Sequence, residues 1–319
     1  MNSKKQIAVE AVLKAAELCQ QVQDEMVSTD AIQKSDRSPV TVADFGSQAL
    51  ICKAIDDAFP ADTIIAEEDA QSLRHNTTLL DRVTGYVQRF VKGEVLNQNV
   101  CEWIDRGSGE IGNSFWTLDP IDGTKGFLRN DQYAIALAWI VQGEVQLGVL
   151  GCPNLPHRLD VTNSERGCLF VAVRGEGTTI YTPKGKLLGE IRVSENVSRL
   201  AESFESTHGD SNTHTKIANE LGFDKPPLQI DSQAKYGIVA RGEASLYIRL
   251  PNPAYPDYRE CIWDHAAGLI VVEEAGGKVT DANGRPLSFL SGRRMTENRG
   301  VVATNGTLHE QVLSILSSI

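Results

Sequence analysis

The chain has 319 residues, which allows two domains or one large domain. Its 31 Lys and Arg residues against 42 Asp and Glu residues give a formal net charge of −11, which argues against a protein that binds nucleic-acid polymers through a basic face. The longest apolar run, Ala134–Val141, is far too short to cross a membrane, and Glu10 interrupts any signal-peptide pattern near the start. The six cysteines show no zinc-type or redox-type spacing, so we expect reduced thiols and a cytoplasmic location.

The first sixty-nine residues predict two helices and a strand. Apolar residues at helical spacing predict a long amphipathic helix over Ile7–Val27. A second helix is predicted over Thr41–Phe59, with Asp44 at the capping-box position usually held by Glu. The β-branched run Thr63–Ala66 predicts a buried strand that ends at Glu67.

Residues 70–114 are polar and partly helical, which predicts an inserted helical arm. After it, Phe115–Leu118 predicts a strand that ends at Asp119. Tyr133–Val141 and Val145–Leu150 are apolar runs separated by a Gln-Gly-Glu turn, which predicts a hairpin. Glycine-rich residues follow the next strand, so we place a domain boundary near residue 180, between an N-terminal α+β part and a C-terminal α/β part over 181–319.

The second half alternates between helical and extended patterns. Helices are predicted over Ser211–Leu221 and Asp264–Glu274, and strands over Ala244–Leu250 and Val301–Thr304. Such alternation predicts layered packing of helices on sheets.

Acidic residues stand where several of these predicted elements begin or end. Asp44 and Asp264 each have a plain alternative role as helix caps, and Asp119 and Asp122 as turn formers. Taken together, these acids and the Ile121 carbonyl supply the oxygen ligands that Mg²⁺ prefers. Gathered carboxylates also repel one another unless a cation lies between them.

Small residues follow directly in Gly123–Phe127, and their backbone N–H groups at a helix start form a phosphate cradle. A metal site beside a phosphate cradle indicates phosphoryl transfer or hydrolysis.

The longer motifs resemble those of the lithium-sensitive, Mg²⁺-dependent phosphatase superfamily of inositol monophosphatases. The motifs that carry this resemblance are Ala66–Asp69, Trp116–Phe127, Trp263–Gly268 and Glu274–Gly277. Within that superfamily, three further segments look like the 3′(2′),5′-bisphosphate nucleotidases: Ser38–Asp44, Asp231–Tyr236 and Tyr247–Pro251.

The resemblance implies an αβαβα layered sandwich and a set of site residues. Two to three Mg²⁺ ions would be held by Glu67, Asp119, Asp122, Asp264 and the Ile121 carbonyl. Asp44 and Thr124 would orient and deprotonate the attacking water, and Gly123 and Thr124 would donate to the scissile phosphate. Family members are inhibited by Li⁺, so the resemblance implies the same here.

The substrate has to be inferred from residues outside these shared motifs. Lys235 and Arg249, with Ser232 close by in sequence, would hold a second phosphate of the substrate that does not react. Asp264 would contact the same substrate. The inserted arm also favours a nucleotide, because simple inositol monophosphatases have a much shorter connection there.

Three histidines have open or minor roles. His208 aligns loosely with a histidine of the family that contacts the nucleotide, and His214 remains its rival. His265 is predicted to face away from the site as a first-turn residue of its helix.

The function predicted from sequence is hydrolysis of the 3′-phosphate of adenosine 3′,5′-bisphosphate to AMP and phosphate, with 3′-phosphoadenylyl sulfate as a second substrate. One alternative is an inositol-bisphosphate, inositol-phosphate or broad sugar-phosphate phosphatase on the same fold. Another is a catalytically silent sensor of nucleotide or metal. The presence of both Asp44 and Thr124 argues against the sensor.

Overall fold

The computed structural model describes residues 1–25, 32–33, 39–40, 42–204, 211–252, 254–255 and 257–318. Thr41 and His208, both singled out from the sequence, lie outside the described residues. The described strands form one seven-stranded sheet, one five-stranded sheet and the small pair β1 (Ile32–Gln33) with β2 (Pro39–Val40).

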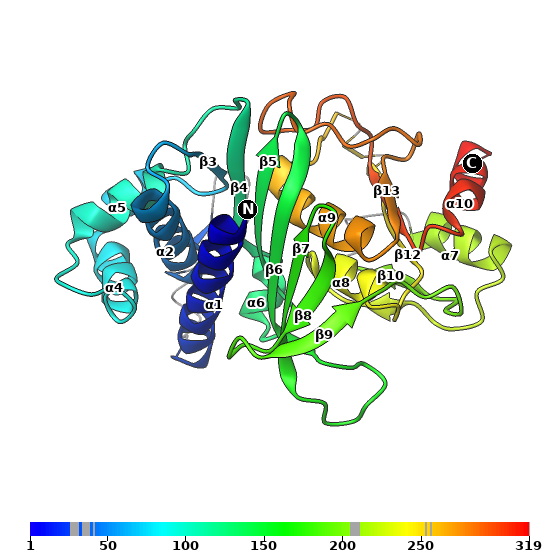
Figure 1. The fold of residues 1–319 in the computed structure, drawn as a ribbon, viewed down its shortest axis with the longest axis horizontal. Coiled ribbons are helices and arrows are strands. Elements are labelled where there is room, and N and C mark those ends of the chain that lie inside the picture. Colours follow the sequence, from blue (N-terminus) through cyan, green and yellow to red (C-terminus); the bar gives the residue numbers. More distant parts are fainter. Residues whose placement is uncertain are drawn as a thin grey trace.

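Helices and sheets alternate in layers across the molecule (Figure 1). Helices α1 (Asn2–Glu25) and α2 (Val42–Ala58) cover one face of the larger sheet. Helices α8 (Ala234–Ala240) and α9 (Ala266–Glu274) lie between the two sheets. Helices α7 (Ser211–Glu220) and α10 (His309–Ser317) lie beyond the smaller sheet, at the end of the molecule that carries the C-terminus. This order confirms the predicted αβαβα sandwich.

The larger sheet follows the chain, with strand order β3-β4-β5-β6-β7-β8-β9. Only the first pair is parallel, and every later neighbour is antiparallel. Its strands are β3 (Thr63–Ala66), β4 (Ser114–Asp122), β5 (Ala134–Val141), β6 (Glu144–Pro156), β7 (Arg166–Val173), β8 (Gly177–Tyr181) and β9 (Leu187–Ile191).

The smaller sheet has the order β11-β10-β12-β14-β13, with β10 parallel to both of its neighbours. Its strands are β10 (Leu200–Glu202), β11 (Leu228–Gln229), β12 (Leu246–Arg249), β13 (Lys278–Thr280) and β14 (Val301–Thr304). The predicted boundary near residue 180 falls inside β8, and the smaller sheet starts only at β10. The chain therefore changes sheets between β9 and β10, and the division into two domains stays a prediction.

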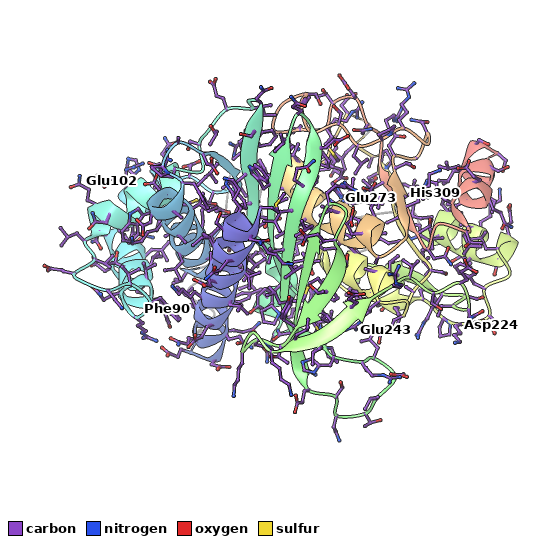
Figure 2. All side chains as sticks on the ribbon, viewed as in Figure 1. Phe90, Glu102, Asp224, Glu243, Glu273 and His309 are labelled. Carbon is purple, nitrogen blue, oxygen red and sulfur yellow. The ribbon has the colours of Figure 1, made fainter. Side chains whose placement is uncertain are left out.

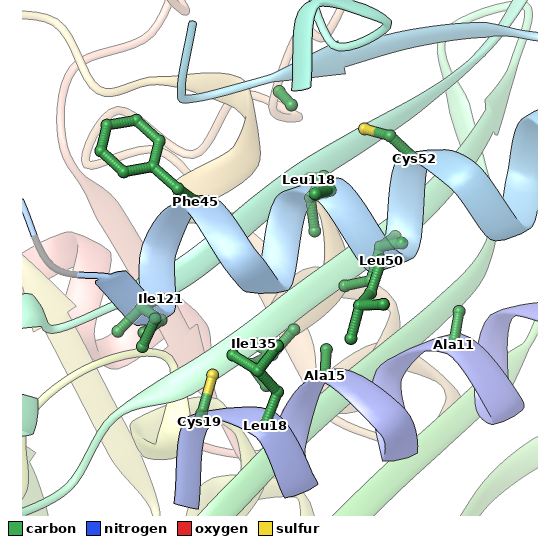
Figure 3. Packing of buried hydrophobic residues seen from close by; sticks show 14 of the residues in the cluster. Ala11, Ala15, Leu18, Cys19, Phe45, Leu50, Cys52, Leu118, Ile121 and Ile135 are labelled. Carbon is green, nitrogen blue, oxygen red and sulfur yellow. The ribbon is translucent and has the colours of Figure 1, made fainter. Parts of the chain in front are cut away.

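Small and large apolar residues of both α1 and α2 interlock in the core beneath these helices (Figure 3). Ala11 and Ala15 of α1 face the same buried cluster as Leu50 of α2. A Cβ atom on Gly46 would lie 2.9 Å from Leu18 Cδ2, so glycine lets the two helices approach closely at this crossing. This packing fixes α2, and with it Asp44, against the sheet.

The inserted arm consists of α3 (Gln71–Arg74), α4 (Thr77–Gln88) and α5 (Asn97–Asp105), which pack together and against α2. Its last residues rejoin the edge of the sheet: Gly109 N donates to Ile64 O at 2.9 Å, and Ala66 N donates to Gly107 O at 2.8 Å. The arm thus supports β3, at the opposite end of the molecule from α7 and α10 (Figure 1). All six cysteines are free thiols. Among the described helices, none has the length and apolarity needed to cross a membrane.

A buried histidine links the end of the chain to the smaller sheet. His309, at the start of α10 (Figure 2), has no exposed surface. Its Nε2 lies 2.9 Å from Thr280 Oγ1 and its Nδ1 lies 3.0 Å from Thr304 Oγ1. Burial, with a smaller effect of Lys278, lowers the pKa of His309 to about 4, and Glu310 opposes that shift.

We predict that acid weakens the fold through His309. A histidine whose pKa is lower in the folded chain stabilises the fold fully above pH about 6.5, and the stabilisation is lost as the pH falls towards 4. His309→Gln keeps a polar side chain but removes this titration. In urea unfolding at pH 7.5 and pH 5.0, the wild type should lose about 1–2 kcal/mol more than the variant. Equal losses in the two proteins would exclude His309 as the titrating group.

Candidate active site

The only parallel strand pair of the larger sheet brings two acidic residues together. Ala66 of β3 lies opposite Leu118 of β4, so the carboxyl ends of both strands lie side by side. Glu67 N donates to Leu118 O at 3.2 Å, which fixes Glu67 next to Asp119. The carboxyl ends of parallel strands are the usual place for a ligand site in an α/β sheet.

A β-bulge then turns Asp119 and Asp122 to the same face of the sheet. Asp119 pairs with Ala136 and Asp122 with Ala134, so two residues of β4 lie opposite the single Ile135. Without the bulge, residues three apart on a strand would point to opposite faces. The predicted strand end at Leu118 is wrong, because β4 runs on to Asp122. Pro120 suggests a strand end, but a bulge tolerates its missing N–H group.

The start of α2 lies against this bulge (Figure 3). Ser47 Oγ donates to Pro120 O at 3.0 Å, and Ile121 packs in the cluster beneath the helix. Asp44 is buried in the first turn of α2, close enough to Asp119 for their charges to repel. Packing of the helix on the strand therefore places Asp44 beside the acids of the sheet.

The second half of the chain adds Asp264. This residue ends a short 3₁₀ turn, η3 (Ile262–Asp264), and does not open the next helix as predicted from the sequence, because α9 begins two residues later. Its Oδ2 accepts from Cys261 N at 3.3 Å, so Asp264 caps the 3₁₀ turn and not α9. The charges of Glu67 and Asp122 both act on Asp264.

Gln233 connects the segments that carry these acids. Its backbone N donates to Asp122 Oδ2 at 2.5 Å, and its side-chain Nε2 donates to Trp263 O at 2.9 Å. Its Oε1 accepts from Gly268 N at 3.3 Å. Through its backbone and its side-chain amide, Gln233 thus fixes the bulge of β4, the 3₁₀ turn and the start of α9 relative to one another.

The acids of the site repel one another. Burial raises the pKa of Asp119 well above its usual value, and Glu67, Asp122, Asp264 and Asp44 raise it further. Burial likewise raises the pKa of Asp264, where Arg249 opposes the shift, and the pKa of Asp122, where Lys235 and Arg249 oppose it. The buried Oδ1 of Asp119 accepts no hydrogen bond from any described residue. An unsatisfied oxygen among several oxygen donors fits a hard cation such as Mg²⁺.

A second group of acidic and histidine side chains lies next to Asp264. Ligand atoms of Glu260, Asp264 and His265 lie within 4.8 Å of one another, so this group could hold a metal ion. Glu260 Oε2 is already 2.9 Å from Arg249 Nη2, and that guanidinium would repel a metal cation there.

The glycine-rich segment after β4 meets the second half of the chain at Ser232. Gly123 has φ +85°, and a Cβ atom there would lie 3.0 Å from Ser232 Cβ, so glycine permits both the turn and the close approach. Ser232 itself has φ +67°. Thr124 Oγ1 donates to the Ile121 carbonyl at 3.2 Å, which leaves the second lone pair of that oxygen for another partner.

Two cations, the buried Lys235 and the partly buried Arg249, lie beside the acids. Lys235 Nζ donates to Ser203 Oγ at 3.0 Å and to Ile230 O at 3.1 Å, which accounts for two of its three N–H bonds. Burial, with a smaller effect of the Arg249 charge, lowers the pKa of Lys235 to about 8, while Asp122 and Asp231 oppose the shift. Lys235 and Arg249 therefore act on each other and on Asp122.

The three histidines have different positions. His208 lies outside the described residues, and its role stays a prediction. His214 is buried on α7, with Nδ1 3.5 Å from Glu202 Oε2. His265 is completely buried, and its Nδ1 lies 2.7 Å from the Tyr236 hydroxyl, so it packs in the core at the start of α9; that it faces away from the site stays a prediction.

Sequence reasoning missed three residues of the site. Gln233 and Glu260 are two of them, although Gln233 stands inside a motif quoted for its neighbours. The third, Arg293, donates through Nη2 to Ala66 O and stacks 4.8 Å from the Trp263 ring. It lies 226 positions from Glu67 in the sequence (293 − 67), so no local pattern could indicate this proximity.

The comparisons with known proteins agree with this geometry. The inositol monophosphatase family profile matches residues 2–319. The chain is 38% identical to the 3′(2′),5′-bisphosphate nucleotidase of Schizosaccharomyces pombe, covering 100% of this chain and 96% of the relative. It is 42% identical to the nucleotidase of the same name from Oryza sativa, covering 96% and 91%.

Solved structures show the same fold. The IMPase from Thermotoga maritima superposes with a TM-score of 0.67 at 22% identity, covering 100% of this chain and 98% of that one. The inositol monophosphatase from Anabaena superposes with a TM-score of 0.63 at 22% identity, covering 100% and 96%. With the profile match over almost every residue and the full-length relatives, these likenesses lead to one conclusion: the chain belongs to the inositol monophosphatase family.

Proposed function

We propose that this chain is a phosphomonoesterase that removes the 3′-phosphate of adenosine 3′,5′-bisphosphate and releases AMP and phosphate. The observation that carries the proposal is the pair of cations, buried Lys235 and partly buried Arg249, beside a cluster of carboxylates. The relatives named above support it, since both carry the name 3′(2′),5′-bisphosphate nucleotidase. 3′-Phosphoadenylyl sulfate is a second candidate substrate, because it too has charge at both positions.

Buried like charges are unfavourable unless an opposite charge is close. A phosphate group at Lys235 and Arg249 would supply that charge through charge-assisted hydrogen bonds. The reacting phosphate would then lie at the carboxylate cluster. Asp122 would lie between the positions of the two phosphates, since it interacts electrostatically with both cations and with Asp119. A substrate with two separated phosphates fits this arrangement better than a monophosphate does.

The acids fit a metal site with oxygen ligands only. We assign two to three Mg²⁺ ions to Glu67, Asp119, Asp122, Asp264 and the Ile121 carbonyl. Bound Mg²⁺ supplies positive charge for the phosphoryl oxygens and the leaving oxygen and makes water a better nucleophile. Glu260 belongs instead to Arg249, since their ion pair holds Glu260 ionised: burial raises its pKa, but Arg249 and His265 together lower it to about 2.

Asp44 and Thr124 are the proposed catalytic pair. The Thr124 hydroxyl donates to the Ile121 carbonyl, which fixes its direction and leaves its lone pairs for the attacking water. Asp44 accepts the proton of that water as a general base. The backbone N–H groups of Gly123 and Thr124 hold the scissile phosphate, and Ser232 lies against Gly123 from the other side. His208 or His214 would contact the nucleoside. Inhibition by Li⁺ stays a prediction from the family resemblance.

Replacing Asp119 should separate activity from stability. Burial and four neighbouring acids disfavour the ionised form of Asp119 in the metal-free fold, so the neutral Asp119→Asn side chain removes one of the charges that repel one another. We predict that the variant melts at the same or a higher temperature than the wild type without Mg²⁺, and that added Mg²⁺ stabilises it less. Its activity should be lost. Asp224→Asn, at an exposed acid, serves as the control. A variant that is less stable in both conditions but still active would assign Asp119 a turn-forming role.

Replacing Asp44 tests the general base. Asn caps a helix about as well as Asp does, so Asp44→Asn should keep the fold. Without a base at this position, kcat should fall by about 10²- to 10⁴-fold while KM changes little. Phosphate release under saturating Mg²⁺, with circular dichroism on the same sample, measures both properties. A folded variant with wild-type turnover would reduce Asp44 to a cap.

Removing the cations tests the proposed substrate. Lys235→Ala and Arg249→Ala should each lower kcat/KM for adenosine 3′,5′-bisphosphate by about 30- to 150-fold, as expected for a lost charge-assisted contact. The same variants should hydrolyse adenosine 3′-monophosphate almost as the wild type does. Lys278→Ala is the matched control, because Lys278 pairs with Glu310 at the surface. Equal losses on both substrates would contradict recognition of a second phosphate, and better hydrolysis of inositol 1,4-bisphosphate would favour the alternative substrate class.

A further inference from the structure

Next to Lys235 and Arg249 lies a cluster of buried polar side chains that the proposed mechanism does not use: Glu260, His265 and Tyr236. Glu260 Oε2 is 2.9 Å from Arg249 Nη2 and 3.5 Å from His265 Nε2. His265 Nδ1 is 2.7 Å from the Tyr236 hydroxyl. The Tyr236 ring packs edge-on against the Tyr247 ring, with 5.0 Å between the ring centres, and Tyr247 lies on the same strand as Arg249.

The residues of this cluster and their two neighbours on β12 come from separate parts of the fold. Tyr236 is on α8, Tyr247 and Arg249 are on β12, Glu260 precedes η3, and His265 caps α9. Glu260 is 7% exposed, Tyr247 is 4% exposed, and Tyr236 and His265 are not exposed at all. These side chains do not form a solvated surface pair, because several parts of the fold hold them: α8, β12, the segment before η3 and the start of α9.

Stability alone does not explain a buried ion pair. Removing two charges from water costs about as much free energy as their attraction returns, so such pairs contribute little net stability. What the ion pair provides is a fixed orientation of the Arg249 guanidinium. The guanidinium is a planar fork with five N–H bonds, and fixing one end on Glu260 determines where the remaining N–H bonds point.

The alternative partners of Arg249 show why its direction matters. Its charge also acts on Asp122 and Asp264, the proposed metal ligands, and on Lys235. Without Glu260, the carboxylate of Asp264 would remain as an attractive partner for this guanidinium. Arg249 would then turn towards the reacting phosphate and away from the second one.

We propose that Glu260 is a positioning residue, supported by His265 and Tyr236, that holds Arg249 ready for the second phosphate and so sets selectivity for bisphosphate substrates. The proposal rests on the proposed function, because it assigns the second-phosphate position to Arg249. Glu260 itself touches neither substrate nor reacting atoms.

The test is a substrate comparison in Glu260→Gln, which keeps the shape of the side chain and removes its charge. We expect KM for adenosine 3′,5′-bisphosphate to rise by about tenfold with kcat nearly unchanged, the size of effect of one weakened charge-assisted bond. Kinetics with adenosine 3′-monophosphate should change less than about twofold. Glu243→Gln is the matched control, since Glu243 pairs with the buried Arg241 away from the site, and its substrate ratio should equal that of the wild type.

Binding of the product separates this proposal from the proposed function. By calorimetry without metal, Glu260→Gln should bind AMP about tenfold more weakly than the wild type, and adenosine equally well. This result would support the positioning role of Glu260 whichever substrate the wild type prefers. If the wild type did not prefer the bisphosphate, only the proposed function would be rejected. If Glu260→Gln does not fold, Tyr236→Phe weakens the same cluster, because it removes the hydroxyl that lies against His265. We then expect AMP to bind about two- to threefold more weakly than to the wild type.

Three outcomes would overturn the proposal. Equal losses on both substrates in a folded variant would give Glu260 a merely structural role. A fall in kcat that higher Mg²⁺ concentrations restore would make Glu260 a metal ligand together with Asp264 and His265. An unchanged ratio of the two substrates, with unchanged AMP binding, would show that Arg249 does not need Glu260.

Discussion

Repulsion among buried carboxylates is the constraint on which this structure depends. Asp119 has four acidic neighbours that raise its pKa beyond the effect of burial itself. A flexible chain would relieve such repulsion by moving the acids apart. Here, Glu67 and Asp119 are fixed by hydrogen bonds between parallel strands, and Asp264 is fixed by a 3₁₀ turn. Since the backbone cannot yield, the repulsion remains in the folded chain and becomes affinity for cations.

Two features keep the acids converged although they come from both halves of the sequence. The bulge at Pro120 rotates Asp122 onto the face of Asp119. Gln233 then ties Asp122 to the segment that carries Asp264, through three hydrogen bonds from one residue. Loss of either feature would separate the acids without removing any of them. The positioning of the site therefore depends on residues that carry no charge.

Much of this arrangement follows from sequence patterns, because local motifs carry it. The strand Thr63–Ala66 is confirmed residue for residue, since its β-branched run is buried on the sheet. The end of β4 was not predictable in the same way, because proline and two Asp residues favour a turn until the pairing with β5 is known. The burial of His265 and the ion pair of Glu260 with Arg249 depend on contacts between α8, β12 and α9, which no local spacing expresses.

The inserted arm and the cation pair are separate in space, and this separation bears on how selectivity arises. From the sequence, we expect the long connection before Asp119 to leave room for a nucleotide, but α4 and α5 pack on α2, and the chain rejoins the sheet edge at β3. Lys235 and Arg249 lie on α8 and β12, on the other side of the larger sheet (Figure 1). The arm therefore supports the strand that leads to Glu67, whereas in our proposal the choice of substrate rests on two cations and on the buried groups that direct them. Under that proposal, a phosphatase of this fold changes its substrate by altering the support of one arginine while its metal site stays the same.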